Sequence, residues 1–225
     1  MASEVKLALA YTSRGNDVFW GLPMYILRQR EMFRDFKVFV GVYLWGTPIE
    51  KLFNDSLDQE WDYLHILDSD VCPEPNTSMA LVANALDICA SPVWMYDAST
   101  NDMHLNVLRA PGQREYKLGN GIEKVFSSSF GSVMIARRVF DTFKMSGESF
   151  TKPSPLISEY LHYETYPPDT VFFAKAHKLG FSVHIDWTCQ FATHHKYAFF
   201  NTPFVMNFVG KVVAGHAGAE RNSGA

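Results

Sequence analysis

The segment YLHILDSDVCPEP (residues 63–75) indicates both the class of fold and the place of a site. Its first five residues are mostly apolar, as in a buried strand. Asp68 and Asp70 end this run, separated only by Ser69, and a loop with two prolines follows. Two carboxylates this close repel each other unless a cation lies beside them. The segment therefore predicts either a cation site at the end of a strand, or a loop that Asp70 caps while Asp68 is solvated.

Strand-like and helix-like patterns alternate through the first part of the chain. Apolar and β-branched runs predict strands, and helical spacing of apolar residues predicts helices. The strands are expected over 5–13, 36–46, 62–70 and 88–96, and the helices over 21–35, 48–61 and 76–87. This order predicts an α/β, Rossmann-like fold with a mostly parallel central sheet and flanking helices. Ligands bind such sheets at the carboxyl ends of the strands, where Asp68 and Asp70 fall.

The second part of the chain is less regular and predicts a smaller, mixed region. HLNVLRAPG (104–112) and SSFGSVMIARRVF (128–140) are typical of strands beside Gly- and Ser-rich turns. A helix is expected over 167–180, because Pro and Asp residues start it and Gly180 ends it. A closing strand is expected over 181–186.

Composition limits the class of protein. The chain has 225 residues, 47% of them hydrophobic, which is enough for one sizeable core. We expect one domain over residues 1–198, followed by an apolar helix or flap and a flexible tail over 199–225. The formal net charge of -4 argues against a general polyanion binder, although a nucleic acid could still occupy a local basic groove.

Cysteine usage and apolar segments bear on the compartment. Cys72, Cys89 and Cys189 are widely spaced and form no C-x-x-C pair, which is typical of reduced thiols in a cytoplasmic protein. The apolar run near the start is too short for a signal peptide. The apolar stretch 197–215 is interrupted by Asn, Pro and Lys residues, so we expect no membrane span. The sequence carries no signal for a particular oligomeric state.

A pair of adjacent histidines supplies further candidate ligands. His194 and His195 follow the predicted strand 181–186 by one loop. Imidazole nitrogen is a common metal ligand. One of the two histidines is therefore a candidate third ligand beside Asp68 and Asp70, and the alternative is that both are surface residues.

Four segments, read in order, resemble glycosyltransferases of the GT-A fold. They are LALAYTSRG, EWDYLHILDSDVCPEP, SSSFGSVMIARRVFD and PPDTVFFAKAHKLGFSVHIDWTCQFATHH. The resemblance is to small single-domain enzymes of the large inverting family 2 group, including phage and bacterial ones, and it spans roughly residues 5–195. It implies that Asp68-Ser69-Asp70 is a D-x-D motif that holds Mn²⁺ or Mg²⁺ on the diphosphate of a nucleotide-sugar donor. It also implies a late histidine ligand, at His194 or else at His195.

The same resemblance assigns roles to two further segments. The loop after the first strand would bind the nucleotide base and ribose through Thr12, Ser13 and Arg14, although these residues equally fit an ordinary polar turn. The acceptor's proton would be taken by Asp169, which matches the Asp of a Glu-Asp pair at the start of a late helix. The Glu is missing here, so inverting stereochemistry stays open, and Asp169 equally fits a helix N-terminal carboxylate. Glu164 is the substitute candidate for the base.

These assignments predict a cytoplasmic, metal-dependent glycosyltransferase, located in the host cytoplasm if the chain is phage-encoded. It would move a sugar from a nucleotide-diphosphate sugar, with UDP as the expected nucleotide, to a hydroxyl acceptor. The acceptor would be a glycan, a lipid headgroup, a protein or a modified DNA base. The metal would stabilise charge on the departing diphosphate, and a carboxylate would deprotonate the acceptor.

Three other classes of protein fit part of the sequence. ILDSDV resembles the D-x-D-x-[TV] motif of haloacid-dehalogenase-type phosphatases, but that motif normally lies on the first strand of the domain. A nucleotidyltransferase of related architecture would usually have a Gly-rich first loop, and TSRGND is poor in glycine. A non-catalytic nucleotide-sugar-binding module would bind Mn²⁺ and UDP without hydrolysis or transfer.

Overall fold

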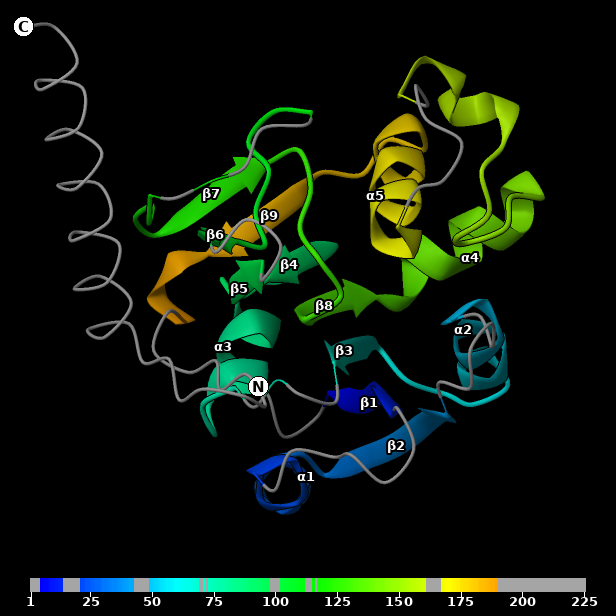
Figure 1. The fold of residues 1–225 in the computed structure, drawn as a ribbon. Coiled ribbons are helices and arrows are strands. Elements are labelled where there is room, and N and C mark those ends of the chain that lie inside the picture. The colour runs from blue at the N-terminus through cyan, green and yellow to red at the C-terminus, as the bar shows by residue number, and fades with distance from the viewer. Residues whose placement is uncertain are drawn as a thin grey trace, which may run out of the picture.

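The computed structural model describes residues 5–13, 21–42, 49–68, 71, 73–97, 102–111, 115, 117–160 and 167–189. In these residues a seven-stranded sheet carries helices on both faces, accompanied by a two-stranded hairpin (Figure 1). The predicted apolar helix and tail over 199–225 lie outside the described residues, so the domain boundary stays a prediction. No helix of the described part is both long and apolar enough to cross a membrane.

The central sheet confirms the predicted class of fold. Its spatial order is β2 (Asp35–Val42), β1 (Lys6–Ser13), β3 (Tyr63–Asp68), β8 (Ser132–Ala136), β4 (Ile88–Ala90), β9 (Val183–Asp186) and β7 (Ile122–Val125). β1 pairs in parallel with β2 and β3, and β4 pairs in parallel with β9. β8 is antiparallel to both β3 and β4, and β7 is antiparallel to β9. All strands except β7 and β8 thus share one direction, so the sheet is mostly parallel, as in a Rossmann-like α/β fold.

Helices cover both faces of this sheet. One face carries α1 (Gly21–Met32) and α3 (Thr77–Ala83), and the other carries α2 (Ile49–Leu57), α4 (Arg137–Ser146) and α5 (Pro168–Lys178). Along β3, Leu64 and Ile66 pack into the core beneath α2, α4 and α5, whereas Leu67 packs beneath α1. This alternation follows from the two-residue repeat of a strand, and it explains why β3 is apolar on both faces.

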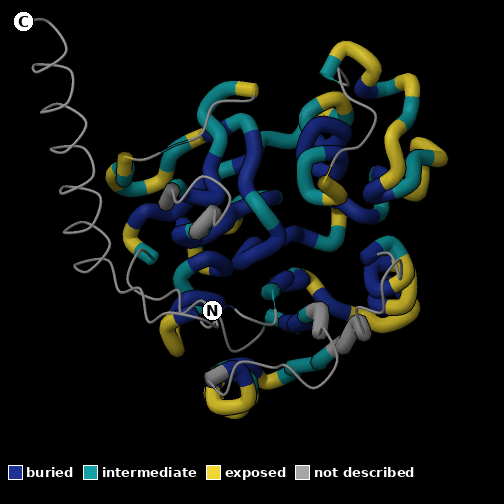
Figure 2. The backbone as a smooth tube through the Cα atoms, viewed as in Figure 1, coloured by how far each residue is buried: buried dark blue, intermediate teal, exposed yellow. Residues whose placement is uncertain are grey.

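The larger core is built around phenylalanine rings. Phe53 of α2 contacts Phe130, Phe140 and Phe172 edge-to-face, at centroid distances of 5.5, 5.2 and 5.9 Å. Such pairs contribute about 0.5–1.5 kcal/mol each beyond the area that they bury. Figure 2 shows the buried residues gathered along the central strands and α5. Phe172 and Phe173, both fully buried, therefore fix α5 against the sheet.

The strand predicted over 88–96 is divided in two. β4 ends at Ala90, and β5 (Trp94–Asp97) leaves the sheet to pair with β6 (Asp102–Leu105). Pro92 lies between β4 and β5 and has no N–H to donate to a strand ladder, which accounts for the break. Of the strand predicted over 104–112, only the first two residues belong to a strand, β6, which ends at Leu105.

The strand predicted over 128–140 combines two elements. Only residues 132–136 form a strand, β8, and α4 begins at Arg137. The buried side chains of α4 recur at helical spacing and are Val139, Phe140 and Phe143. The sequence-based interpretation also missed β7 and two short 3-10 helices, η2 (Pro155–Tyr160) and η3 (Trp187–Cys189).

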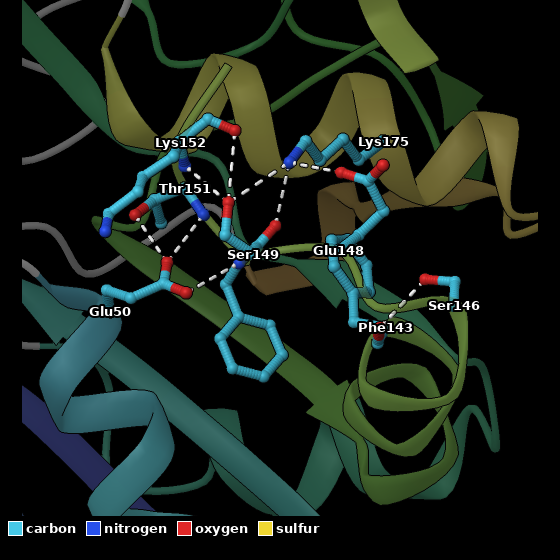
Figure 3. Close-up of polar contacts among 9 residues, drawn as sticks. Glu50, Phe143, Ser146, Glu148, Ser149, Thr151, Lys152 and Lys175 are labelled. Atoms are coloured by element: carbon cyan, nitrogen blue, oxygen red, sulfur yellow. Dashed lines mark hydrogen bonds and ion pairs between the residues drawn. The ribbon is translucent and has the colours of Figure 1, made fainter. Parts of the chain in front are cut away.

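The loop that follows α4 is fastened to α2 by one carboxylate. Glu50, in the first turn of α2, accepts hydrogen bonds from the backbone N–H groups of Phe150 (2.9 Å) and Thr151 (2.8 Å). The Thr151 hydroxyl also donates to it (2.8 Å). Figure 3 shows the Glu50 carboxylate reaching this loop from α2. Backbone donors of an irregular loop are thereby satisfied without water.

The same loop is fastened to α5 by a buried ammonium group. Lys175 is fully buried, and its Nζ donates to the Ser149 carbonyl (2.9 Å) and pairs with Glu148 (2.7 Å; Figure 3). This ammonium lowers the pKa of the Glu148 carboxyl. α5 ends near this contact, and Gly180 adopts a φ of 91°, a left-handed conformation that favours glycine. The loop therefore connects α5 to α2 through Lys175 and Glu50.

We expect Lys175→Ala to destabilise the protein by about 3–5 kcal/mol, because it leaves a cavity and a poorly solvated Glu148 carboxylate. Lys175→Met removes the charge and the hydrogen bond to Ser149 but keeps most of the volume and so leaves no large cavity; its loss should be smaller, about 1–3 kcal/mol. Urea unfolding at neutral pH measures both. A loss below about 1 kcal/mol for Lys175→Ala, the range of ordinary surface substitutions, would show that the ion pair does not anchor α5.

Candidate functional site

Two strands end side by side at one edge of the sheet. β1 and β3 pair in parallel, and Thr12 lies opposite Asp68 in this pairing. Asp68 is the last residue of β3 and is partly exposed. The N–H of the buried Val71 donates to the Asp68 carbonyl (3.0 Å). Asp68 and the end of β1 thus lie together at the carboxyl edge of the sheet.

A turn at residues 127–131 connects this edge to α5. It precedes β8, which pairs with β3. The Gly131 carbonyl accepts a hydrogen bond from the Asp68 N–H (3.3 Å). The backbone N–H of the preceding residue, Phe130, lies near the Asp169 carboxyl at the start of α5 and lowers its pKa. Asp68 and Asp169, which are far apart in the sequence, therefore lie on two sides of the 127–131 turn.

Asp169 is held in the first turn of α5. The residue as a whole is partly exposed, but its carboxyl group is enclosed by protein. The Thr170 N–H donates to Oδ1 (2.7 Å). Burial raises the pKa of the Asp169 carboxyl, and the nearby N–H groups of Thr170 and Phe130 oppose this rise. A carboxyl with a raised pKa at the ligand-binding edge of a sheet is suited to proton transfer.

Most of the other predicted site residues are not described. Arg14, Ser69, Asp70, Glu164, His194 and His195 lie outside the described residues, and so do the side chains of Thr12 and Ser13. In the described ranges alone, no group of three or more His, Cys, Asp and Glu side chains could hold a metal ion. Asp68 offers one partly exposed carboxylate, a hard oxygen ligand of the kind that Mn²⁺ and Mg²⁺ take. The assignment of the remaining ligands stays a prediction.

Sequence reasoning did not single out the buried polar residues behind the site. His65, within β3, is fully buried, and its ring is hydrogen-bonded to the hydroxyls of Ser78 (2.8 Å) and Ser132 (3.1 Å). Burial lowers the pKa of His65 to about 3, so the ring is neutral. Asn106, directly after β6, is likewise buried. The signal that could have found both is a single polar residue inside an apolar run, because buried polar groups need hydrogen-bond partners.

Comparison with known proteins gives distant structural likenesses alone. The sequence matches no protein-family model and no curated protein. Among solved structures, A197 from STIV aligns with a TM-score of 0.47 at 14% identity, over 80% of this chain and 81% of that chain. CMP:2-keto-3-deoxy-manno-octonic acid synthetase, solved with CTP, aligns with a TM-score of 0.42 at 12% identity, over 94% of this chain and 99% of that chain. Neither likeness assigns a family or an activity, so the function has to be inferred from the site.

We expect Asp169→Asn to change how stability depends on pH. Because the pKa of Asp169 is raised in the folded state, the wild-type protein should lose stability as pH rises from the ordinary aspartate value through the raised one. The Asn variant cannot ionise and should lack this loss, so its stability relative to the wild type should increase over the same window. Urea unfolding across acidic and neutral pH measures the difference. Parallel curves would show that this carboxyl titrates normally.

Proposed function

We propose that the protein is a metal-dependent glycosyltransferase that moves a sugar from a nucleotide-diphosphate sugar to a hydroxyl acceptor. The observation that supports it best is the placement of Asp68 and Asp169 on two sides of the 127–131 turn at the carboxyl edge. Both residues are partly exposed; Asp68 ends a strand, and burial raises the pKa of the Asp169 carboxyl at the start of a helix. Two carboxyl groups that different elements bring to one edge can serve two different tasks, namely binding a cation and accepting a proton.

The first task would belong to Asp68, the last residue of β3, and to Asp70, two residues further along the chain. Asp68 and Asp70 would bind Mn²⁺ or Mg²⁺, with His194 or His195 as a further ligand. The cation, when bound, would stabilise the charge that develops on the departing diphosphate. Thr12, Ser13, Arg14 and Ser69 are the proposed contacts of the nucleotide, with UDP as the expected one. The pairing of Thr12 opposite Asp68 supports this assignment, because it brings the ends of β1 and β3 to one edge of the sheet.

The second task belongs to Asp169, with Glu164 as the substitute. Its carboxylate would take the proton from the acceptor hydroxyl as the acceptor oxygen forms a bond to the anomeric carbon. The bond from that carbon to the diphosphate oxygen breaks, and the nucleotide diphosphate leaves. A base on the face opposite the leaving group inverts the anomeric centre, so inverting stereochemistry follows from this assignment. The acceptor would be a glycan, a lipid headgroup, a protein or a modified DNA base.

A screen of nucleotide sugars for Mn²⁺-dependent hydrolysis tests the proposed function. We expect Asp70→Ala and Asp68→Asn to reduce metal-dependent turnover at least ~100-fold, since each removes a ligand of the group that stabilises the leaving diphosphate. Asp169→Asn should reduce transfer by about 100-fold or more through loss of the base. Asp58→Asn, an exposed carboxylate beyond α2, is the matched control and should retain full activity.

The same samples distinguish the other classes of protein. Near-normal activity of Asp70→Ala would contradict the proposed metal site. Release of pyrophosphate from a nucleoside triphosphate, without hydrolysis of nucleotide sugars, would identify a nucleotidyltransferase. Phosphate release from a simple phosphomonoester would identify a phosphatase, and binding of Mn²⁺ and UDP without any turnover would identify a binding module.

A further inference from the structure

Asn106 is a buried polar residue that joins two segments at the carboxyl edge. It follows β6 and is 7% exposed. Its backbone N–H donates to the Val93 carbonyl (2.8 Å), and its Oδ1 accepts from the Val93 N–H (2.7 Å). These two bonds fasten Asn106 to the segment that follows β4. Its Nδ2 group donates in the other direction, to the hydroxyls of Ser128 (3.3 Å) and Ser129 (3.2 Å) in the 127–131 turn.

Ser129 extends this contact to the backbone that touches both acids. Its hydroxyl accepts a hydrogen bond from the Gly131 N–H (3.1 Å), which closes a small turn over Phe130. The Gly131 carbonyl accepts from the Asp68 N–H (3.3 Å), and the Phe130 N–H lies near the Asp169 carboxyl and lowers its pKa. One side-chain hydroxyl therefore separates Asn106 from the peptide groups that contact the two acids.

Packing leaves the turn little freedom to adopt another shape. A Cβ added to Gly131 would lie 3.0 Å from the Ser129 Oγ and 3.4 Å from a methyl group of Val93. The Phe130 ring is buried against Phe53 and Phe172 in the larger core. The backbone of the turn is thus fixed by its ring on one side and by Asn106 and Ser129 on the other.

We propose that Asn106 is a positioning residue of the candidate active site, which acts through Ser129 to hold the Phe130–Gly131 backbone against Asp169 and Asp68. Its consequence for catalysis rests on the proposed function, whereas the geometry that it controls can be measured without any substrate. A displacement of ~1 Å at a catalytic group can cost about 100-fold in rate, so a residue that fixes the backbone beside a base affects turnover without touching substrate.

The contact between Phe130 and Asp169 gives the inference a specific signature. A hydrogen bond from a backbone N–H favours the ionised form of a carboxyl group. Among the described residues, the groups that act on the Asp169 carboxyl are its own N–H, the N–H and hydroxyl of Thr170, and the N–H of Phe130, with no charged side chain. Phe130 alone of these lies outside α5. If the turn relaxes, the Phe130 N–H moves away from the carboxyl, and the pKa of Asp169 should rise further.

Single substitutions on neighbouring serines isolate this effect. Asn106→Ala removes the whole contact, and Ser129→Ala removes only the hydroxyl that connects Asn106 to the Gly131 N–H. Ser128→Ala is the matched control, because Ser128 also accepts from Asn106 but has no bond to Gly131. The pKa of Asp169 is followed by carbon-13 NMR of the aspartate carboxyl groups, assigned with Asp169→Asn. Melting temperature and the pH profile of kcat/KM for UDP-glucose with Mn²⁺ are measured on the same samples.

We expect Asn106→Ala and Ser129→Ala to raise the pKa of Asp169, to move the acidic limb of kcat/KM to higher pH, and to lower turnover at neutral pH by about tenfold or more. Ser128→Ala should match the wild type in both titration and rate. A lower melting temperature with an unchanged titration of Asp169 would overturn the inference and leave Asn106 a structural residue. If Asn106→Ala does not fold, the two serine variants decide: equal titrations for both overturn it. A shifted titration without turnover of any nucleotide sugar would support the positioning role and count against the proposed function.

Discussion

The antiparallel pairing of β8 between β3 and β4 is the constraint on which the site depends. If β8 were parallel to its neighbours, it would begin at the opposite edge of the sheet. The turn that precedes it would then lie far from the carboxyl edge, where such sheets usually bind ligands. Because β8 runs antiparallel to β3 and β4, it begins at the carboxyl edge. The 127–131 turn, which precedes it, therefore lies beside Asp68. The strand is buried throughout and pairs on both sides, so this placement is set by the whole sheet and not by the loop itself.

The reversal of β8 is also the main reason why the sequence predicts the elements better than their arrangement. Apolar runs and helical spacing identify β1, β3, α1 and α5, because the apolar residues of each element recur in a pattern that shows which side chains are buried. Periodicity says nothing about strand direction, and the merged apolar run over 128–140 concealed the change from β8 to α4. Asp68 and Asp169 could each be selected from their local context. Their closeness could not, because it depends on how β8 crosses the sheet between them.

Buried polar groups surround the site and are hydrogen-bonded, although none was selected from the sequence. Asn106 bonds to two segments, and His65 bonds to Ser78 and Ser132 across β3 and β8. Leaving such a group without a partner costs about 1–3 kcal/mol, so an arrangement that breaks these contacts is disfavoured even when its apolar packing is sound. The same holds for Lys175, which is fully buried and forms an ion pair with Glu148. Losing the partner of a buried charge costs more than losing the partner of a neutral group. The polar contacts thus select one arrangement among those that the apolar surfaces would allow.

Phe130 has a consequence for how the protein responds to heat. Its ring belongs to the larger core, together with Phe53 and Phe172, while its backbone N–H contacts the Asp169 carboxyl group. A single residue thus links the packing of the core to the position of the acid that we propose as the base. If Asp169 is the base that we propose, warming that loosens this aromatic packing should displace it as well, so activity should be lost together with the first loosening of the core.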